Sequence, residues 1–329
     1  MSKKIKSNSI FSIKTLKDFN DLAIEIFFYQ YEENEIYRKF VENLSIELNS
    51  IKHFQQIPFL PIEFFKSHDI VSGNFNPEKV FLSSGTTDFQ RSKHLIKDLS
   101  LYEGSFNNGF EHFYGNPSDY CILALLPNYI EQGDSSLIFM IDNFIKKSNC
   151  NESSFYLNDD LKLIETLQKL ELKNQKTILI GVSFALLDLA EKYKIDIPNT
   201  IMMETGGMKG RKKEITREEL HKILKQSFGV EQIHSEYGMT ELFSQAYSKS
   251  DGRFNCPPWM KVLSRQIYDP LSIQNNQKSG GLNIIDLANI NSCSFIATQD
   301  LGKVYADESF EVLGRFDSSD VRGCNLMVI

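Results

Sequence analysis

Apolar residues in the first fifty positions recur with the spacing of one helical face. Because neighbours on such a face are three or four residues apart, we predict helix from about Thr15 to Leu48. Pro58 and Pro61 end this pattern, since proline interrupts helical hydrogen bonding. The buried face of the predicted helix comprises Phe19, Leu22, Ala23, Ile26 and Phe27.

Short apolar runs alternate with helical patterns from about residue 120 to residue 240. The run Tyr120–Pro127 is continuously apolar, as expected of a strand buried on both faces. This alternation favours a parallel, doubly wound sheet, which binds ligands at the carboxyl ends of its strands. The further strands predicted are Phe155–Leu157, Thr177–Gly181, Thr200–Glu204 and Gln232–Glu236. The helices predicted are Asp98–Phe113, Ser136–Ser148, Asp159–Leu170, Phe184–Tyr193 and Thr216–Phe228.

The pattern changes after Met260, where the apolar runs become short and turns lie between them. Such spacing is typical of an antiparallel sheet. The strands predicted there are Val262–Ile267, Gly281–Leu287, Cys293–Thr298, Lys303–Ala306 and Phe310–Leu313. The sequence therefore predicts an α/β fold with a doubly wound, largely parallel sheet and an antiparallel C-terminal portion.

Composition narrows the class of protein. Of the 329 residues, 41% are hydrophobic and 24% are charged, which is normal for a globular protein. The net charge of −7 and the absence of long basic runs argue against nucleic-acid binding. The longest apolar stretch, Cys121–Leu126, is too short to span a bilayer. We therefore expect a cytoplasmic protein with neither nucleic acid nor membrane as partner.

Cysteine usage supports the same compartment. The five cysteines are Cys121, Cys150, Cys256, Cys293 and Cys324. Their odd number, wide spacing and lack of a CxxC motif argue against a disulfide framework and a structural zinc site. We predict reduced thiols.

The stretch Phe81–His94 carries the most distinctive candidate chemistry. Ser83-Ser-Gly-Thr-Thr87 can fold tightly and direct several N–H and O–H donors toward one point. Arg91, Lys93 and His94 follow, and cations at that position favour a polyanion such as a nucleotide phosphate chain. A polar surface turn is the alternative interpretation.

Four later segments place polar residues beside predicted strand ends. Each also has a plainer interpretation as a turn, a helix start or a charged tail. Three glycines in one of them would let another group approach the backbone closely. The segments are Glu204-Thr-Gly-Gly-Met-Lys-Gly210, Ser235-Glu-Tyr-Gly-Met-Thr-Glu-Leu242, Thr298-Gln-Asp-Leu-Gly302 and Leu313–Cys324.

Taken together in this order, the motifs resemble the core motifs of the adenylate-forming superfamily of acyl and aryl ligases. Arg91-Ser-Lys-His94, the ETGGMKGR segment and the terminal RGCNL most resemble the LuxE family of acyl-protein synthetases. The resemblance extends from about Phe81 to Leu326. It implies an acid–thiol ligase that activates a fatty acid with ATP and Mg²⁺ to an acyl-adenylate, then transfers the acyl group to a cysteine thiol. An acyl-accepting protein, carrier or reductase, and a second copy of the chain, are the implied partners.

The same resemblance assigns roles to individual residues. Tyr237 would lie on adenine, Thr240 would touch the α-phosphate and Glu241 would ligate Mg²⁺. Asp300 and Arg315 would hold the ribose. The cofactor-binding loops would comprise Ser83, Ser84, Gly85, Thr86, Thr87, Gly206, Gly207 and Gly238. Cys324 would accept the acyl group, and neighbouring Arg322 would favour its thiolate.

Two features depart from the superfamily pattern. Asp88 stands where glycine is usual, which places an anion near the phosphates. The chain stops at Ile329, so we expect the small C-terminal lid domain and its catalytic lysine to be absent. Lys93 or Lys209 is then the candidate substitute. The predicted division is a core domain, 1–313, and a hinge-like tail, 314–329, that carries Cys324.

Two other functions remain open. Gly181-Val-Ser-Phe-Ala185 follows a strand and opens a helix, as the nucleophile elbow of a serine hydrolase does, with His221 or His234 as base. The simpler role for Ser183 is a helix N-cap. The second alternative is a non-catalytic protein of the adenylating fold that binds nucleotide or acyl chains, which the missing lysine would favour.

Overall fold

The computed structural model describes residues 7–83, 91–126, 133–157, 159–206, 215–267, 269, 271–274 and 277–316. The chain forms two compact units. The central unit contains the described residues from Val80 to Arg91 and from Tyr102 to Phe254. The terminal unit contains those before Val80, from Ser92 to Leu101, and from Asn255 onward.

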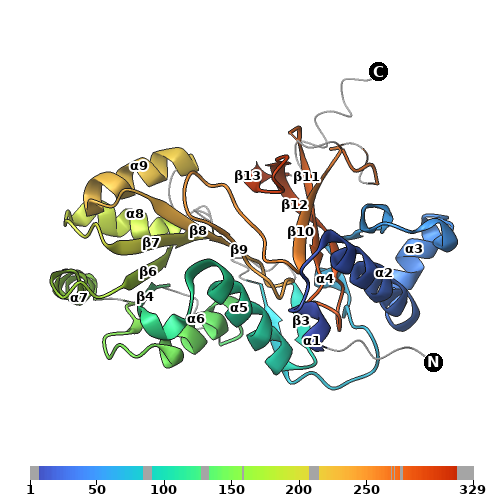
Figure 1. Ribbon diagram of the computed structural model, residues 1–329, viewed down its shortest axis with the longest axis horizontal. Coiled ribbons are helices and arrows are strands. Elements are labelled where there is room, and N and C mark those ends of the chain that lie inside the picture. Colours follow the sequence, from blue (N-terminus) through green and yellow to red (C-terminus); the bar gives the residue numbers. More distant parts are fainter. Residues whose placement is uncertain are drawn as a thin grey trace. The chain divides into compact units, whose positions relative to one another are not determined.

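A six-stranded sheet in the order β5-β4-β6-β7-β8-β9 forms the centre of the central unit (Figure 1). Its first five strands are parallel, which confirms the doubly wound sheet predicted between residues 120 and 240. The edge strand β9 was not predicted and runs antiparallel to β8. The strands are β4 (Cys121–Leu125), β5 (Ser154–Phe155), β6 (Thr177–Val182), β7 (Thr200–Thr205), β8 (Ile233–Tyr237) and β9 (Ala246–Ser248).

Helices cover both faces of this sheet. Figure 1 shows α5 and α6 on one side and α8 and α9 on the other. Every residue of β4 and β6 is buried, because helices pack on both sides of these strands. Thr216 caps α9 by accepting from the Glu219 N–H. The helices are α5 (Leu99–Tyr114), α6 (Ser136–Lys147), α7 (Asp160–Leu172), α8 (Ser183–Lys192) and α9 (Arg217–Phe228), with a 3₁₀ turn at Pro117–Asp119.

The terminal unit contains the antiparallel sheet predicted after Met260, in the order β10-β11-β12-β13, with the short β1 parallel to β12. One continuous strand, β12, replaces the two strands predicted between Cys293 and Ala306. A register shift at Leu301/Gly302 bends this strand without ending it, so Asp300 lies within a strand rather than in a turn. The strands are β1 (Leu60–Pro61), β10 (Met260–Arg265), β11 (Ser279–Asp286), β12 (Phe295–Val304) and β13 (Phe310–Arg315).

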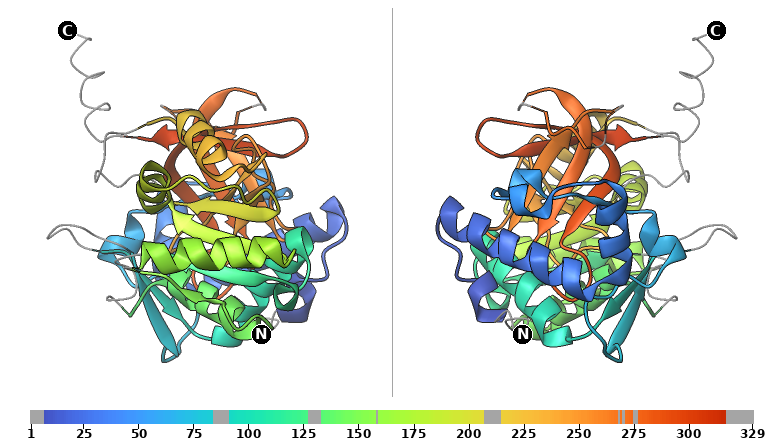
Figure 2. Two further views of the ribbon diagram at one scale, coloured as in Figure 1. Left: turned by 90° about the vertical axis from the view of Figure 1, so that its left-hand side faces the viewer. Right: turned by 90° about the vertical axis from the view of Figure 1, so that its right-hand side faces the viewer.

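Helix α2 packs against this sheet (Figure 2, right, blue on orange). The ring of Phe27 contacts that of Phe295 on β12, and Gln30 donates to the carbonyl of Asn289. The predicted helix Thr15–Leu48 is broken at Asn34, whose side chain caps the next helix and also donates to the Ser292 carbonyl. The helices are α1 (Ser7–Ile10), α2 (Leu16–Glu33), α3 (Glu35–Asn43) and α4 (Phe64–Ser67), with 3₁₀ turns at Leu48–Ser50 and Phe54–Gln56.

Two short strands flank the Ser/Thr/Gly loop, β2 (Lys79–Leu82) before it and β3 (Lys93–Ile96) after it. The short β run expected to end at Phe81 and Leu82 is confirmed as β2, whereas β3 was not predicted. Among the described helices, none combines the length and the hydropathy needed to cross a lipid bilayer.

The prediction of uniformly reduced cysteines is wrong for one pair. Cys121 and Cys150 are joined as a disulfide, with their Cα atoms 5.0 Å apart. Sequence spacing gave no sign of this pair, because the sheet topology brings the end of α6 beside the start of β4. Cys256 and Cys293 carry free thiols.

Candidate active site at the carboxyl ends of the parallel strands

Polar side chains gather where β6, β7 and β8 end. In the parallel register, Val182 pairs with Thr205, and Thr205 pairs with Glu236, so the three strands end side by side. Ser183 follows β6 directly. This edge of the sheet is where doubly wound folds bind ligands.

The carboxylate of Glu204 is the centre of the polar cluster on the α9 side. Its side chain is 3% exposed. One oxygen accepts from the Ser183 hydroxyl at 3.0 Å, and the other lies 3.1 Å from Nε of Arg217. Burial alone would raise the pKa of Glu204, but the His221, Arg217 and Ser235 side chains outweigh burial and lower it. Glu204 is therefore held as an anion in the interior.

Glu236 forms a second buried carboxyl beside the first. Its Oε2 accepts from Oγ1 of Thr205 at 2.5 Å. Burial raises the pKa of Glu236 to about 7; the Thr205 hydrogen bond opposes this rise and the charge of Glu204 adds to it. Glu204 and Glu236 thus lie at the ends of neighbouring strands with their pKa values pushed apart, as is common at functional sites.

Ser183 serves neither of the two roles weighed for it. It is the first residue of α8, and Val182 is the N-cap, so Ser183 does not cap the helix. Its hydroxyl lies 2.7 Å from the carbonyl of Gly206 as well as bonding Glu204. A serine nucleophile needs a base such as histidine to take its proton. Of the two candidate bases, Nε2 of His221 lies 3.7 Å from Glu204 and Nδ1 of His234 lies 3.0 Å from the Tyr114 hydroxyl, while the Ser183 hydroxyl contacts Glu204 and Gly206. Ser183 therefore ties the end of β6 to the end of β7.

The glycine segment after β7 begins with a backbone turn that requires glycine. Gly206 has φ +67°, in the left-handed region that other residues rarely adopt. Gly207 and Lys209 lie outside the described residues. The Ser183 bond to the Gly206 carbonyl fixes where this turn starts.

Tyr237, the predicted base-stacking residue, ends β8 and is buried. Its ring centroid lies 5.7 Å from that of Phe254, and the guanidinium of Arg217 lies 5.2 Å from the centroid of the same Phe254 ring. Sequence reasoning missed Phe254 and Arg217, which have no motif signal. Gly238 follows Tyr237, and a Cβ there would come within 2.6 Å of Glu236 Oε1.

Thr240 and Glu241 lie in the turn that follows β8. Thr240 is partly exposed, whereas the Glu241 side chain is buried, with 6% exposure. A carboxylate oxygen is a hard donor of the kind that Mg²⁺ prefers. The donor chemistry of this turn therefore fits the predicted metal.

The predicted phosphate loop is described only at its borders. Ser83 follows β2, and its carbonyl accepts from Nε of Arg91 at 2.5 Å. Ser84, Gly85, Thr86, Thr87 and Asp88 lie outside the described residues. Lys93 on β3 forms an ion pair with Asp69 at 2.7 Å, within the terminal unit. Arg91 therefore fixes the base of the loop.

The predicted ribose pair belongs to the terminal unit. Asp300 on β12 and Arg315 on β13 are register neighbours, and Nε of Arg315 lies 3.1 Å from Oδ1 of Asp300. Asp300 is buried, whereas the Arg315 side chain is 72% exposed. The structure thus brings these two residues together. Cys324 lies outside the described residues.

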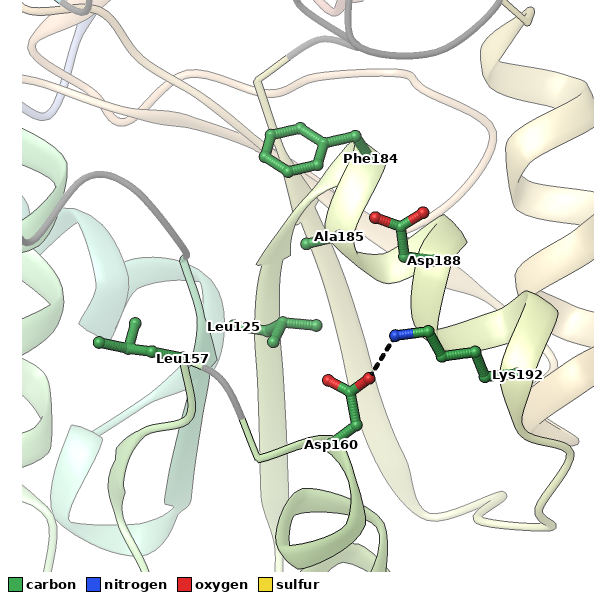
Figure 3. Close-up of a pocket in the computed structure, with 7 residues that line it drawn as sticks. All are labelled: Leu125, Leu157, Asp160, Phe184, Ala185, Asp188 and Lys192. Carbon is green, nitrogen blue, oxygen red and sulfur yellow. Dashed lines mark hydrogen bonds and ion pairs between the residues drawn. The ribbon is translucent and has the colours of Figure 1, made fainter.

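A pocket of about 300 Å³ opens between α7 and α8 in the central unit (Figure 3). Figure 3 shows Lys192 and Asp160 directed toward each other, and their ion pair measures 2.7 Å. Asp188 adds a second carboxylate. Among its described lining residues are two carboxylates and one cation, a balance that does not favour a polyphosphate. Its remaining walls are Leu125, Leu157, Phe184 and Ala185.

Comparison with known families decides the relationship. The family model described as acyl-protein synthetase, LuxE, matches residues 14–329. The chain belongs to the LuxE family. The match begins well before Phe81, so the LuxE assignment also covers helices α2 and α3. A search of curated proteins finds no match.

Solved structures place this LuxE chain in the adenylate-forming fold. ATP-bound MatB from Rhodopseudomonas palustris is 16% identical, with a TM-score of 0.54 over 72% of this chain and 47% of that one. 2-Hydroxyisobutyryl-CoA ligase in complex with 2-HIB-AMP and CoA is 13% identical, with a TM-score of 0.67 over 92% of this chain and 68% of that one. The chain thus spans about half the length of the MatB structures. At these identities the similarity establishes the fold.

Proposed function

We propose that this LuxE-family chain is an acid–thiol ligase that activates a carboxylic acid, in particular a fatty acid, with ATP and Mg²⁺. The observation that carries the proposal is the family match over residues 14–329. The neighbours in fold support it, since MatB is bound to ATP and the CoA ligase is bound to the adenylate 2-HIB-AMP in those structures.

The reaction has two steps. In the first, a carboxylate oxygen of the acid attacks the α-phosphorus of ATP, and pyrophosphate leaves. In the second, a cysteine thiolate attacks the carbonyl carbon of the acyl-adenylate, AMP leaves, and a thioester forms. We assign the thiolate to Cys324, with transfer onward to an acyl-accepting protein, carrier or reductase.

The chain's own residues would bind and orient the nucleotide. Tyr237 would stack on the adenine, and Thr240 would hold the α-phosphate. Glu241 would ligate Mg²⁺, which neutralises phosphate charge when it is bound. Asp300 and Arg315 would hold the ribose hydroxyls; this requires Arg315 to share Asp300 with the ligand, since the two now bond each other.

The Ser/Thr/Gly loop after β2 would bind the phosphate chain of ATP. Ser83, Ser84, Gly85, Thr86 and Thr87 would surround the β- and γ-phosphates, with Arg91 fixing the start of the loop.

Lys93 is the candidate for the catalytic cation, and it forms an ion pair with Asp69 in the structure. Lys93 would have to exchange Asp69 for a phosphate oxygen to supply the positive charge proposed for it.

Gly206, Gly207 and Gly238 would allow the nucleotide to approach the backbone.

Pyrophosphate exchange tests the first step. The protein should incorporate labelled pyrophosphate into ATP only when a carboxylic acid is present. A panel of acids of different lengths then reports which acyl chain length the enzyme prefers. Thr240→Ala should lower the exchange, whereas Lys222→Ala, at an exposed position on α9, should leave it unchanged. A chain that binds ATP without exchange would be a non-catalytic binder.

Intact mass spectrometry tests the second step. A hydroxylamine-labile acyl adduct should form on the wild-type protein and be missing in Cys324→Ser, while pyrophosphate exchange stays unchanged. An adduct that persists in Cys324→Ser would overturn the assignment of the acceptor.

A further inference from the structure

The Cys121–Cys150 pair lies at the edge of the sheet opposite the candidate active site. Cys121 is the first residue of β4 and is fully buried. Cys150 follows α6 and is partly exposed. Their Cα atoms lie 5.0 Å apart, a separation that disulfide-bonded residues commonly have. The partial exposure makes Cys150 the sulfur that an external thiol reaches first.

Hydrogen bonds hold the two cysteine segments together independently of the sulfurs. The hydroxyl of Ser148 donates to the Tyr120 carbonyl at 2.6 Å. The N–H of Ile122 donates to Oγ of Ser153 at 2.9 Å. These bonds flank both cysteines along the chain. Reduction therefore leaves the thiols adjacent, so the effective concentration of one for the other stays high.

A carboxylate lies beside the exposed sulfur. Oε2 of Glu152 is 3.3 Å from Sγ of Cys150, and Oε1 pairs with Nζ of Lys169 at 2.8 Å. The hydrogen bond from Lys169, followed by one from the backbone, lowers the pKa of Glu152. The carboxylate is placed to accept the proton of the Cys150 thiol, and Lys169, through its ion pair with that carboxylate, offsets the negative charge that would otherwise disfavour a thiolate.

The two free thiols of the described residues, Cys256 and Cys293, lie in the terminal unit. Cys293 is buried, whereas Cys256 is partly exposed like Cys150. Burial raises the pKa of both thiols to about 12. What distinguishes Cys150 is the Glu152 carboxylate beside its sulfur.

We propose that Cys121 and Cys150 form a thiol–disulfide exchange site for low-molecular-weight thiols and disulfides. Cys150 is the exchanging sulfur, Glu152 is its proton acceptor and Cys121 is the resolving thiol. The site lies outside the proposed ligase chemistry, so its test does not depend on that function.

Oxidation of the two protein thiols consumes one small disulfide, RSSR. Glu152 takes the Cys150 proton, the thiolate bonds one sulfur of a small disulfide RSSR, and RS⁻ leaves and takes the proton of Cys121. The Cys121 sulfur then bonds Cys150 and displaces the second RS⁻, which takes the proton from Glu152. Two protein thiols and RSSR become one protein disulfide and two RSH.

Oxidation should also stabilise the fold, because the bond closes a separation of 29 residues. A loop of this length predicts that the melting temperature of the oxidised chain exceeds that of the reduced chain by roughly 5–10 °C.

Redox titration of the full chain tests the proposal. The chain is equilibrated in mixtures of reduced and oxidised glutathione, alkylated with N-ethylmaleimide and mapped by peptide mass. Cys121 and Cys150 should lose alkylation together, in one reversible transition. Glu152→Gln should slow oxidation about tenfold without moving the midpoint, and Cys256→Ser should change neither. Cys121→Ser should accumulate the mixed disulfide at Cys150.

Three results would overturn the exchange site. The two cysteines could titrate independently, or the disulfide could resist reduction until the chain unfolds. The third is a metal: the ligand atoms of Cys121, Cys150 and Glu152 lie within 4.8 Å of one another, so one retained equivalent of zinc that blocks both cysteines would assign the cluster to metal binding. Should Cys121→Ser fail to fold, Cys150→Ser at the more exposed position must abolish the transition.

Discussion

Replacing Glu236 with glutamine should stabilise the protein at alkaline pH and leave it nearly unchanged at acidic pH. In the folded chain the pKa of Glu236 is raised from 4.5 to about 7, chiefly by burial. A raised carboxyl pKa contributes stability that is complete below pH 4.5 and is lost as pH rises through 7. Glutamine still accepts from Thr205 but never ionises.

The size of this stability difference follows from the gap between the ordinary pKa of Glu236, 4.5, and its pKa in the folded chain, about 7. The gap is about 2.5 (7 minus 4.5), and a pKa difference of one corresponds to about 1.4 kcal/mol. Glu236→Gln should therefore exceed the wild type in free energy of unfolding by about 3 kcal/mol above pH 7.5, and by close to nothing at pH 4.5. His234 has the opposite tendency, because burial lowers its pKa to about 4, but it is present in both proteins and cancels.

Urea denaturation of both proteins between pH 4.5 and 8.5 measures this difference. The exposed Glu231→Gln, two residues before β8, controls for the loss of one negative charge. A Glu236→Gln difference that stays constant across the pH range would refute the raised pKa and the picture of Glu236 as a buried, neutral carboxyl at pH 6.

Three further predictions concern single contacts. Ser183→Ala leaves one oxygen of the buried Glu204 without its hydroxyl donor, which should cost about 1–3 kcal/mol of unfolding free energy in urea titration; an unchanged midpoint would contradict the bond. Gly229→Ala should cost about 1–3 kcal/mol, because φ is +65° and the new Cβ would collide with the Asp196 side chain, which would have to move. Gly115→Ala, also at positive φ but with open space around it, should cost only about 1 kcal/mol, and equal costs would refute the steric argument.

The parallel sheet could be predicted from the sequence because its signals are local. The run at Cys121–Leu125 is apolar at every position, and helical patterns separate the strands. Local signals did not predict the break at Asn34, whose side chain bonds a carbonyl 258 residues away. Nor did they predict the continuous strand through Asp300, since the pairing of β12 with β13 overrides a turn-like sequence.

Some residues of the candidate site could likewise be predicted from local sequence, and others could not. Gly206 and Tyr237 could be found because they belong to contiguous motifs, and the structure places both at strand ends. The bond of Ser183 to Glu204 and the stacking of Arg217 on Phe254 join residues from separate elements. Such pairs have no characteristic spacing in the sequence, so they can be identified only from the folded structure.

Acid-dependent pyrophosphate exchange is the most direct test of the central claim. The purified chain is incubated with ATP, Mg²⁺ and labelled pyrophosphate, with and without a fatty acid, and label in ATP is counted. The account predicts label only in the presence of acid, with a marked loss in Thr240→Ala. Label that appears equally without acid, or no label with any acid although ATP binds, would contradict it.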